Sequence, residues 1–256
     1  MKVRALAAGT AVLLVLAGCS SAAPAAEPSP TGLTGELTVF AAASLQGAFD
    51  AIATEFAERN TGVPVNPVTY DGSSTLATQL VDGATADVFA SADLATMATV
   101  TDAGLADGTA TVFATNSLEI VVAPGNPLGI GSLADLAALS TSGGKVVLCA
   151  AQVPCGSAAH RVLDGLTLTP VSEEQNVKAV LTKVQTGDAD AGLVYRTDVL
   201  AAGTTVEGVE LPEVASAVNE YPVVVLEDGE VARAFVDLVL SADGQRILGD
   251  LGFTAP

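Results

Sequence analysis

The sequence contains little with which to bind a sugar ring or a nucleobase. It has no tryptophan, and aromatic residues make up only 4% of its 256 positions. Stacking on aromatic side chains is a main way in which proteins hold unpaired bases, so no stacking platform is expected. Hydrophobic residues nevertheless make up 50% of the chain. That is enough for one large or two modest domains with cores of valine, leucine and alanine.

Basic residues are also scarce. The chain has 10 lysines and arginines against 29 aspartates and glutamates, a formal net charge of −19 at pH 7. Such a surface repels nucleic acid, and no stretch of the chain offers a basic patch that would offset the repulsion. A free dianion is repelled as well, although salt screens this effect beyond about 10 Å. No nucleic-acid partner is expected, and any anion site must depend on strong local hydrogen-bond donors.

The sequence offers little catalytic chemistry. His160 is the only histidine, and neither Gly-x-Ser-x-Gly nor His-Glu-x-x-His occurs, so the marks of serine hydrolases and zinc proteases are missing. Four aspartates are candidate metal ligands, but their spacing matches no known loop, and turns or helix caps account for them. They are Asp71, Asp87, Asp93 and Asp198. We expect no enzyme, no metal-ion site and no cofactor; a secreted hydrolase is the enzymatic alternative.

The N-terminus carries the features of an export signal. Residues 1–4 are basic, and residues 5–16 are apolar but too few to span a bilayer. Leu16-Ala-Gly-Cys19 follows and resembles a bacterial lipobox, which is cleaved before the cysteine that then carries lipid. We expect residues 1–18 to be a lipoprotein signal peptide and Cys19 to be lipidated. The alternative is an ordinary signal peptide followed by a chance cysteine.

The segment after the lipobox has the composition of a linker. Residues 19–34 are rich in serine, alanine, proline and glycine, which bury no core and predict a flexible tether. No later stretch of the sequence is a candidate membrane-spanning helix. We expect a monomer outside the cytoplasmic membrane, held to the outer face of that membrane by its lipid.

Two short serine segments give the clearest functional indication. Thr38–Leu45 and Tyr70–Leu76 each have the pattern of an apolar strand that ends in small residues and turns into a helix at a serine. The first turn of a helix has unpaired N–H groups and a partial positive charge. Two such helix starts that face each other would hold an oxyanion without lysine or arginine. We therefore predict a small-anion receptor; the alternative is that Ser44 and Ser73 only cap their helices.

Strands and helices alternate through the rest of the chain, which predicts α/β lobes with parallel sheets. Ligands of such sheets bind at the carboxyl ends of the strands, where both serine segments fall. The expected strands are 36–42, 63–70, 86–92, 145–150 and 191–195. The expected helices include 74–81 and 173–185, and residues 230–253 are expected to be helical and to rejoin the first lobe.

Two similar extended runs predict how the lobes are joined. Ser117–Pro124 and Tyr221–Leu226 are both apolar and extended, and we expect them to be paired crossovers between two lobes, near 116–123 and 219–226. The resulting assignment is 35–116 and 222–256 to lobe I and 117–221 to lobe II.

Seven motifs, taken together, link the chain to a known family. They are Val-Phe-Ala-Ala-Ala-Ser-Leu at 39–45, Ser-Ser-Thr-Leu at 73–76, Ala-Asp-Val-Phe-Ala-Ser-Ala-Asp at 86–93, Asn-Ser-Leu at 116–118, Gly-Leu-Val-Tyr at 192–195, Glu-Tyr-Pro-Val at 220–223 and Gly-Phe-Thr at 252–254. Over essentially all of residues 35–256 the chain resembles the molybdate-binding proteins, the extracytoplasmic receptors of molybdate ABC importers. The resemblance implies the type II periplasmic-binding-protein fold, with two α/β lobes joined by a two-stranded hinge around a ligand cleft. It also implies high-affinity binding of molybdate and tungstate for delivery to an ABC permease.

The resemblance further implies a ligand set. In that family, hydroxyls and main-chain N–H groups from five places hold a tetrahedral oxyanion. The matching positions in this sequence are Ser44, Ser73, Cys155, Val177 and Tyr195. The two serines and the tyrosine would donate hydroxyls, whereas Cys155 and Val177 would donate only backbone N–H groups. Cys155 stands where the family has a small, alanine-like residue. Ser74 is the alternative to Ser73, and a core role is the alternative for Tyr195.

This donor set suits a fully deprotonated dianion, because hydroxyls and backbone N–H groups donate and no carboxylate is needed to accept a ligand proton. Other ligands stay open. Sulfate is smaller and would leave the bonds of a molybdate-sized pocket long. A phosphate site would need an acceptor for the ligand proton, and an organic-acid site would need an arginine, for which only Arg161 and Arg196 lie near the second-lobe motifs. A sensor or adhesin domain of the same fold is a further alternative.

The cysteines predict a disulfide. With Cys19 lipidated, Cys149 and Cys155 remain for an oxidising compartment. They lie at an expected strand end and in the turn that follows, which can bring their Cα atoms within the roughly 4.4–6.8 Å that a disulfide requires. We predict a bridge that holds the Val153–Gly156 turn so that the Cys155 N–H faces the anion. The alternative is two buried free thiols.

Overall fold

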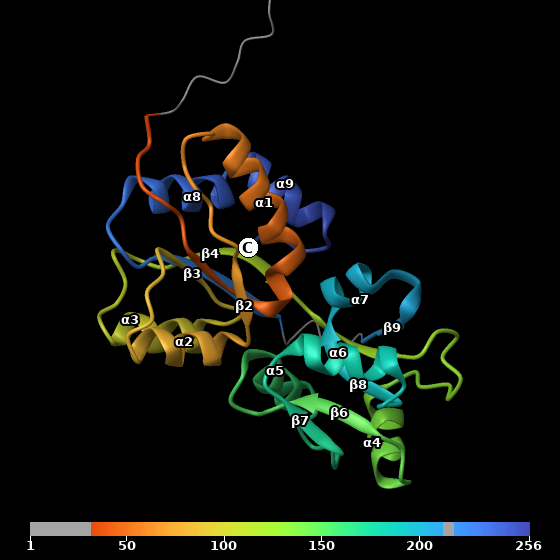
Figure 1. Ribbon diagram of the computed structural model, residues 1–256. Coiled ribbons are helices and arrows are strands. Elements are labelled where there is room, and N and C mark those ends of the chain that lie inside the picture. The colour runs from red at the N-terminus through yellow and green to blue at the C-terminus, as the bar shows by residue number, and fades with distance from the viewer. Residues whose placement is uncertain (1–31, 212–217) are drawn as a thin grey trace, which may run out of the picture.

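The computed structural model describes residues 32–211 and 218–256. Two five-stranded sheets with flanking helices form two lobes that lie against each other (Figure 1). The predicted two-lobe α/β architecture is therefore confirmed. The predicted signal peptide, Cys19 and residues 20–31 of the predicted tether lie outside the described residues. Within the described ranges, no helix combines the length and the apolar character that crossing a membrane requires.

The first sheet has the strand order β2-β1-β3-β10-β4. Its strands are β1 (Val39–Ala42), β2 (Thr69–Asp71), β3 (Val88–Ala90), β4 (Thr111–Asn116) and β10 (Asn219–Val225). β1 pairs in parallel with β2 and β3, whereas β10 is antiparallel to both β3 and β4. The prediction of a wholly parallel sheet is therefore wrong for β10.

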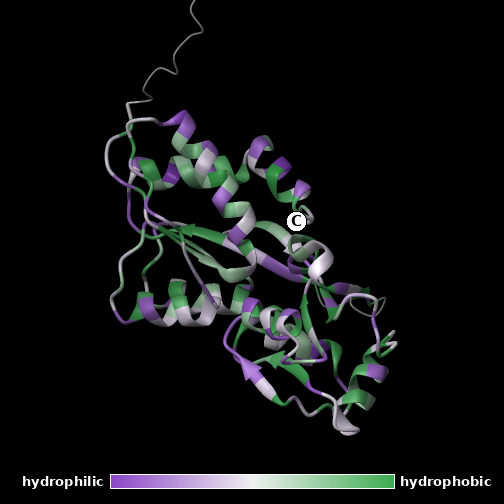
Figure 2. Cartoon of the chain, turned by 45° about the vertical axis from the view of Figure 1, so that its right-hand side comes forward, coloured by the Kyte–Doolittle hydropathy of each residue, from purple (hydrophilic) through white to green (hydrophobic). Residues whose placement is uncertain are grey.

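Helices cover both faces of the first sheet (Figure 1). On one side are α1 (Gln46–Arg59), α8 (Glu230–Leu240) and α9 (Ala242–Asp250), and on the other are α2 (Ser73–Val81) and α3 (Leu94–Asp102). Alternate residues of a strand point to opposite faces, so Val39 joins Phe49 and Phe235 in one core while Phe40 joins Leu76 in the other. Figure 2 shows the strands mostly as hydrophobic and the helices around them as mixed.

The second sheet has the strand order β7-β6-β8-β5-β9. Its strands are β5 (Leu118–Val122), β6 (Val146–Cys149), β7 (Ser172–Glu174), β8 (Ala191–Tyr195) and β9 (Glu207–Glu210). Its helices are α4 (Leu133–Thr141), α5 (Pro154–Val162), α6 (Val177–Thr186), α7 (Arg196–Ala202) and the 3-10 turn η2 (Gly203–Thr205). β5 is antiparallel to β8 and β9, whereas β6 is parallel to β7 and β8.

The predicted start of a helix at Glu173 is wrong. Residues 172–174 pair with β6 as the edge strand β7. The side chain of Asn176 then accepts a hydrogen bond from the backbone N–H of Ala179 at 3.0 Å, which is the contact of an N-cap residue. This contact sets the start of α6 at Val177.

The chain passes between the sheets just before β5 and β10, the two strands that run antiparallel to their neighbours. Ser117 alone separates β4 from β5, and residues 211–218 separate β9 from β10. β5 and β10, the two predicted crossover runs, lie in different sheets, at the two places where the chain passes from one sheet to the other. Asn219 pairs with Asn116, and residues 219–221 therefore belong to the first sheet rather than to the second lobe. A chain that arrives from the other lobe enters at the carboxyl edge, which explains why β5 and β10 run against their neighbours.

Candidate functional site

A small pocket lies between the two lobes. Its lining contains all five residues for which the sequence predicts a ligand role, namely Ser44, Ser73, Cys155, Val177 and Tyr195. The pocket has a volume of about 20 Å³, and both lobes contribute to its lining. We refer to it as the inter-lobe pocket.

The five residues meet because each follows or ends a strand at the carboxyl edge of its sheet. Ser44 lies in the 3-10 turn η1 (Ala43–Leu45) directly after β1, and Ser73 opens α2 after β2. In the second lobe, Cys155 lies in the first turn of α5 after β6, Val177 opens α6 after β7, and Tyr195 ends β8. This is the edge at which open α/β sheets bind ligands.

Helix starts from both lobes therefore point at one space. The first-turn N–H groups of a helix have no intrahelical acceptor and carry part of the positive end of the helix dipole. Ser73, Cys155 and Val177 occupy such first-turn positions in α2, α5 and α6. The pocket thus offers backbone donors from opposite sides to a single anion.

Neither serine acts as a side-chain helix cap. The N-cap position of α1 is Leu45, not Ser44, so the alternative in which Ser44 caps that helix is wrong. The Ser44 Oγ instead lies 3.0 Å from the hydroxyl of Tyr221. The Ser73 Oγ accepts a hydrogen bond from the backbone N–H of Ala92 at 3.0 Å. Ser74 does not line the pocket; its hydroxyl donates to the carbonyl of Gln152 in the other lobe at 2.9 Å.

The two tyrosines near the pocket stay protonated. Tyr195 is only 1% exposed and Tyr221 is fully buried, and their rings meet edge to face with centroids 5.9 Å apart. Burial raises the pKa of both phenols above the usual value, because a phenolate would lose its solvation. Both side chains therefore keep an O–H group that can donate. The sequence marks Tyr221 only as a member of a family motif, without a role.

The pocket lining carries little charge. Among the described residues that line it there is no lysine, arginine or histidine, and Asp71 is the one carboxylate. One oxygen of Asp71 accepts hydrogen bonds from the Gly72 N–H at 2.7 Å and from Asn176 Nδ2 at 2.9 Å. An anion in this pocket would therefore be held by neutral dipoles rather than by a cation.

Contacts across the pocket join the lobes directly. The Asn176–Asp71 hydrogen bond links α6 to β2, and the Ser74–Gln152 hydrogen bond links α2 to the loop before α5. Gly72 lies so close to the second lobe that a Cβ atom there would be 2.1 Å from the carbonyl oxygen of Gln175. The sequence analysis gave Asp71 only a turn or cap role and missed Gly72 and Asn176. The glycine before the serine that starts α2 was a usable signal for close backbone approach.

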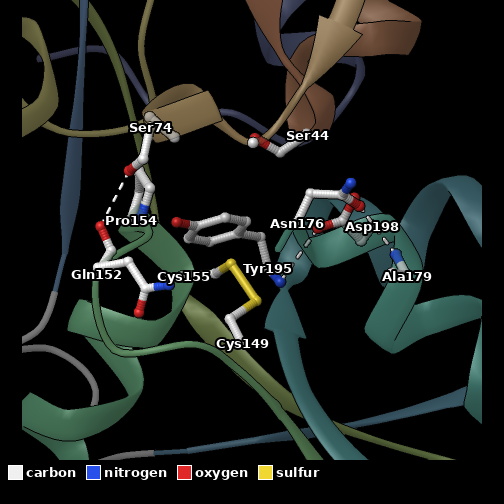
Figure 3. The surroundings of a disulfide bond; sticks show 12 residues. Ser44, Ser74, Cys149, Gln152, Pro154, Cys155, Asn176, Ala179, Tyr195 and Asp198 are labelled. Carbon is white, nitrogen blue, oxygen red and sulfur yellow. Dashed lines mark hydrogen bonds between the residues drawn. A yellow bond between two sulfur atoms is a disulfide. The ribbon is translucent and has the colours of Figure 1, made fainter. Parts of the chain in front are cut away.

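A disulfide joins Cys149, the last residue of β6, to Cys155, with Cα atoms 5.7 Å apart (Figure 3). The bridge closes the turn that carries the first residues of α5. Figure 3 shows it beside the ring of Tyr195. His160 lies further along α5 with an exposed side chain.

Comparison with known proteins places this fold and pocket in a family. The model for bacterial extracellular solute-binding proteins matches residues 37–254. The chain belongs to the bacterial extracellular solute-binding protein family. Among curated relatives of this solute-binding protein, molybdate-binding protein ModA of Mycobacterium tuberculosis is 50% identical over 260 residues, which is 98% of each chain. The predicted resemblance to the molybdate-binding proteins is confirmed.

Solved structures share the fold of the solute-binding protein. The periplasmic molybdate-binding protein of Azotobacter vinelandii has a TM-score of 0.73 at 22% identity, over 86% of this chain and 99% of that one. The sulfate-binding protein SubI of Mycobacterium tuberculosis has the same TM-score at 18% identity, over 87% of both chains. The type II periplasmic-binding fold is thereby confirmed, but the fold alone does not choose between anions.

Proposed function

We propose that this protein binds molybdate, and tungstate with it, in the inter-lobe pocket and delivers the anion to an ABC permease of the cytoplasmic membrane. The observation that carries the proposal is the convergence of all five predicted donor residues on one small pocket without a cation. The 50% identity to a molybdate-binding protein supports molybdate over sulfate.

The energetics of the donor set support tight binding. Each hydrogen bond to a charged group contributes roughly 1.5–3 kcal/mol net. Five to seven such bonds, from three hydroxyls and several backbone N–H groups, offset the cost of association and allow a sub-micromolar Kd. Since the donors carry no formal charge, selectivity depends on the size of the anion and on its lack of a proton.

A thermal-shift titration of the mature chain tests this function. A ligand that binds only the folded state at 100 times its Kd stabilises that state by about 2.7 kcal/mol, which raises the Tm of a protein of this size by roughly 5–10 °C. Molybdate and tungstate should give this rise at micromolar concentration, whereas sulfate and phosphate should not. A rise with sulfate at the same concentration would favour a sulfate receptor.

We also propose that Cys19 carries a lipid that holds the protein at the outer face of the cell membrane. The support is the Leu16-Ala-Gly-Cys19 motif after a short apolar stretch, followed by a linker-like segment. Wild type should fractionate with membranes and Cys19→Ala should not. Equal membrane association of both forms would contradict the anchor.

A further inference from the structure

Asn219 lies at the centre of a hydrogen-bond chain behind the inter-lobe pocket. It is the first residue of β10 and is only 2% exposed. Its Oδ1 accepts a hydrogen bond from the Arg161 guanidinium at 2.7 Å. Its Nδ2 donates to the carbonyl of Ala92 and to the hydroxyl of Tyr195, both at 2.8 Å.

The partners of Asn219 fix the orientation of its amide. A guanidinium only donates and a backbone carbonyl only accepts. The oxygen of the amide must therefore face Arg161 and its nitrogen must face Ala92. That nitrogen cannot accept a hydrogen bond, so the Tyr195 hydroxyl is the acceptor in its contact with Asn219. The proton of Tyr195 therefore goes to another group, either the neighbouring Tyr221 hydroxyl, with which Tyr195 also interacts, or an acceptor on the pocket side.

Ser73 is held in the same way. Its Oγ accepts from the backbone N–H of Ala92, whose carbonyl accepts from Asn219. The Ser73 proton is therefore also available to an acceptor in the pocket. Asn219 thus supports one hydroxyl from each lobe, and both hydroxyls are turned into donors by groups that cannot accept.

We propose that Asn219, itself oriented by Arg161, is a positioning residue that sets the direction of hydrogen bonding in the pocket and so selects oxyanions that lack a proton over those that carry one. The inference rests on the proposed function and adds a residue that does not touch the ligand. In this proposal Asn219 sets the anion specificity by orienting neutral hydroxyls, rather than by placing a charged group against the ligand.

The substitution Asn219→Asp directly tests the direction of the hydrogen bond between residue 219 and the Tyr195 hydroxyl. A carboxylate of the same shape keeps the contact with Arg161 but only accepts, so the Tyr195 hydroxyl would donate to it and present lone pairs to the pocket. Calorimetry at pH 8 compares molybdate with monohydrogen phosphate, which are both dianions and are repelled alike by the added charge. We expect molybdate affinity to fall about tenfold or more and the molybdate-to-phosphate affinity ratio to fall with it by about tenfold.

A double-mutant cycle with Tyr195→Phe separates positioning from other effects. Tyr195→Phe should weaken molybdate binding about 10- to 100-fold in wild type and by less than about threefold in the Asn219→Asp background. The inference would be overturned if the losses of molybdate binding free energy in the two single variants add up in the double variant and the molybdate-to-phosphate affinity ratio stays unchanged. Glu220→Gln is the matched control, because it removes a charge from the next, exposed position of β10 and should leave both affinities unchanged.

The outcomes distinguish this inference from the proposed function. If wild type binds no molybdate, the proposed function and the role of Asn219 are both rejected. If wild type binds molybdate but the cycle is additive, only the role of Asn219 is rejected. Circular dichroism of the apo variants checks folding. If Asn219→Asp does not fold, Asn219→Ala takes its place, and the anion ratio should then fall about threefold or more; an unchanged ratio overturns the inference.

Discussion

At the scale of single residues, the pocket depends on buried groups that donate hydrogen bonds without carrying charge. Ser73 and Tyr195 are each only 1% exposed, and their oxygens accept hydrogen bonds from groups behind them. In surroundings from which water is largely excluded, a hydrogen bond is electrostatically stronger than in water. Neutral hydroxyls can therefore hold a dianion in a chain whose net charge is −19.

The serine hydroxyls should matter for binding, and each also has a buried partner within the protein. Ser44→Ala or Ser73→Ala removes one of the proposed hydrogen bonds to the anion and leaves the backbone donors in place. We expect each to weaken molybdate binding by roughly 1.5–3 kcal/mol. Each should also lower the Tm of the apo protein by a few degrees, because the buried Ala92 N–H or the Tyr221 hydroxyl loses a partner. Ser142→Ala is the control, because that hydroxyl bonds only within the exposed end of α4. If both pocket variants bind as wild type, the serines do not contact the ligand.

The buried tyrosines predict alkaline sensitivity. Burial raises the pKa of Tyr195 and Tyr221 in the folded state above the value near 10 of an unfolded chain. Their contribution to stability is therefore complete below about pH 10 and is lost as the pH rises from there toward the folded-state values. Urea unfolding at pH 8–11 should show a steeper loss of stability above pH 10 in wild type than in Tyr221→Phe. Equal slopes would contradict the buried, protonated phenols.

At the scale of elements, the helix starts bring the backbone donors together, and the disulfide holds one of them. The bridge between β6 and α5 closes a ring of only a few residues, so its effect on the unfolded chain is modest, about 2 kcal/mol in the loop model. Its larger effect is expected on the position of the Cys155 N–H, because an ordered loop lowers the cost of binding.

Breaking the bridge should therefore affect binding more than stability. Cys149→Ser leaves the Cys155 N–H in place but frees the turn. We expect molybdate affinity to fall several-fold while the apo Tm falls by only a few degrees, as measured by calorimetry and thermal melting. Mass spectrometry of wild type, alkylated without reduction, is the accompanying control. Recovery of both cysteines as alkylated thiols from fresh protein would reject the bridge.

Local patterns in the sequence predict most elements but not their pairing. The apolar runs and serine starts predict β1, β3, β8 and the helix α2 within a few residues. The sequence does not predict that Asn176 rather than Glu173 marks the start of α6, because a short edge strand and a helix start have similar composition. The reversed β10 and the contact of Asn219 with Tyr195 depend on partners far along the chain. Periodicity and turn signals do not encode such contacts.

At the scale of the whole molecule, the lobes must approach closely to complete the pocket. Gly72 tests this requirement, since a Cβ atom there would be 2.1 Å from Gln175 O across the lobes. Its φ of −56° suits alanine as well as glycine. We therefore expect Gly72→Ala to fold normally but to hinder closure.

Two measurements check this expectation. Small-angle scattering should show a smaller radius of gyration for wild type with molybdate than without it, as hinge closure requires, and a reduced change for Gly72→Ala. Calorimetry should show about tenfold or greater loss of affinity in that variant. Gly47→Ala is the control, because nothing lies within 4 Å of a Cβ at that position. Wild-type binding by Gly72→Ala would show that close approach there is unnecessary.

The most direct measurement is a calorimetric titration of the mature protein with molybdate, tungstate and sulfate at one salt concentration. The central claim is that neutral donors from both lobes form a pocket for a large, fully deprotonated oxyanion. It predicts that molybdate and tungstate bind at least about a hundredfold more tightly than sulfate, a gap of roughly 2.7 kcal/mol. Equal affinity for sulfate, or no binding heat with molybdate at several temperatures, would contradict it.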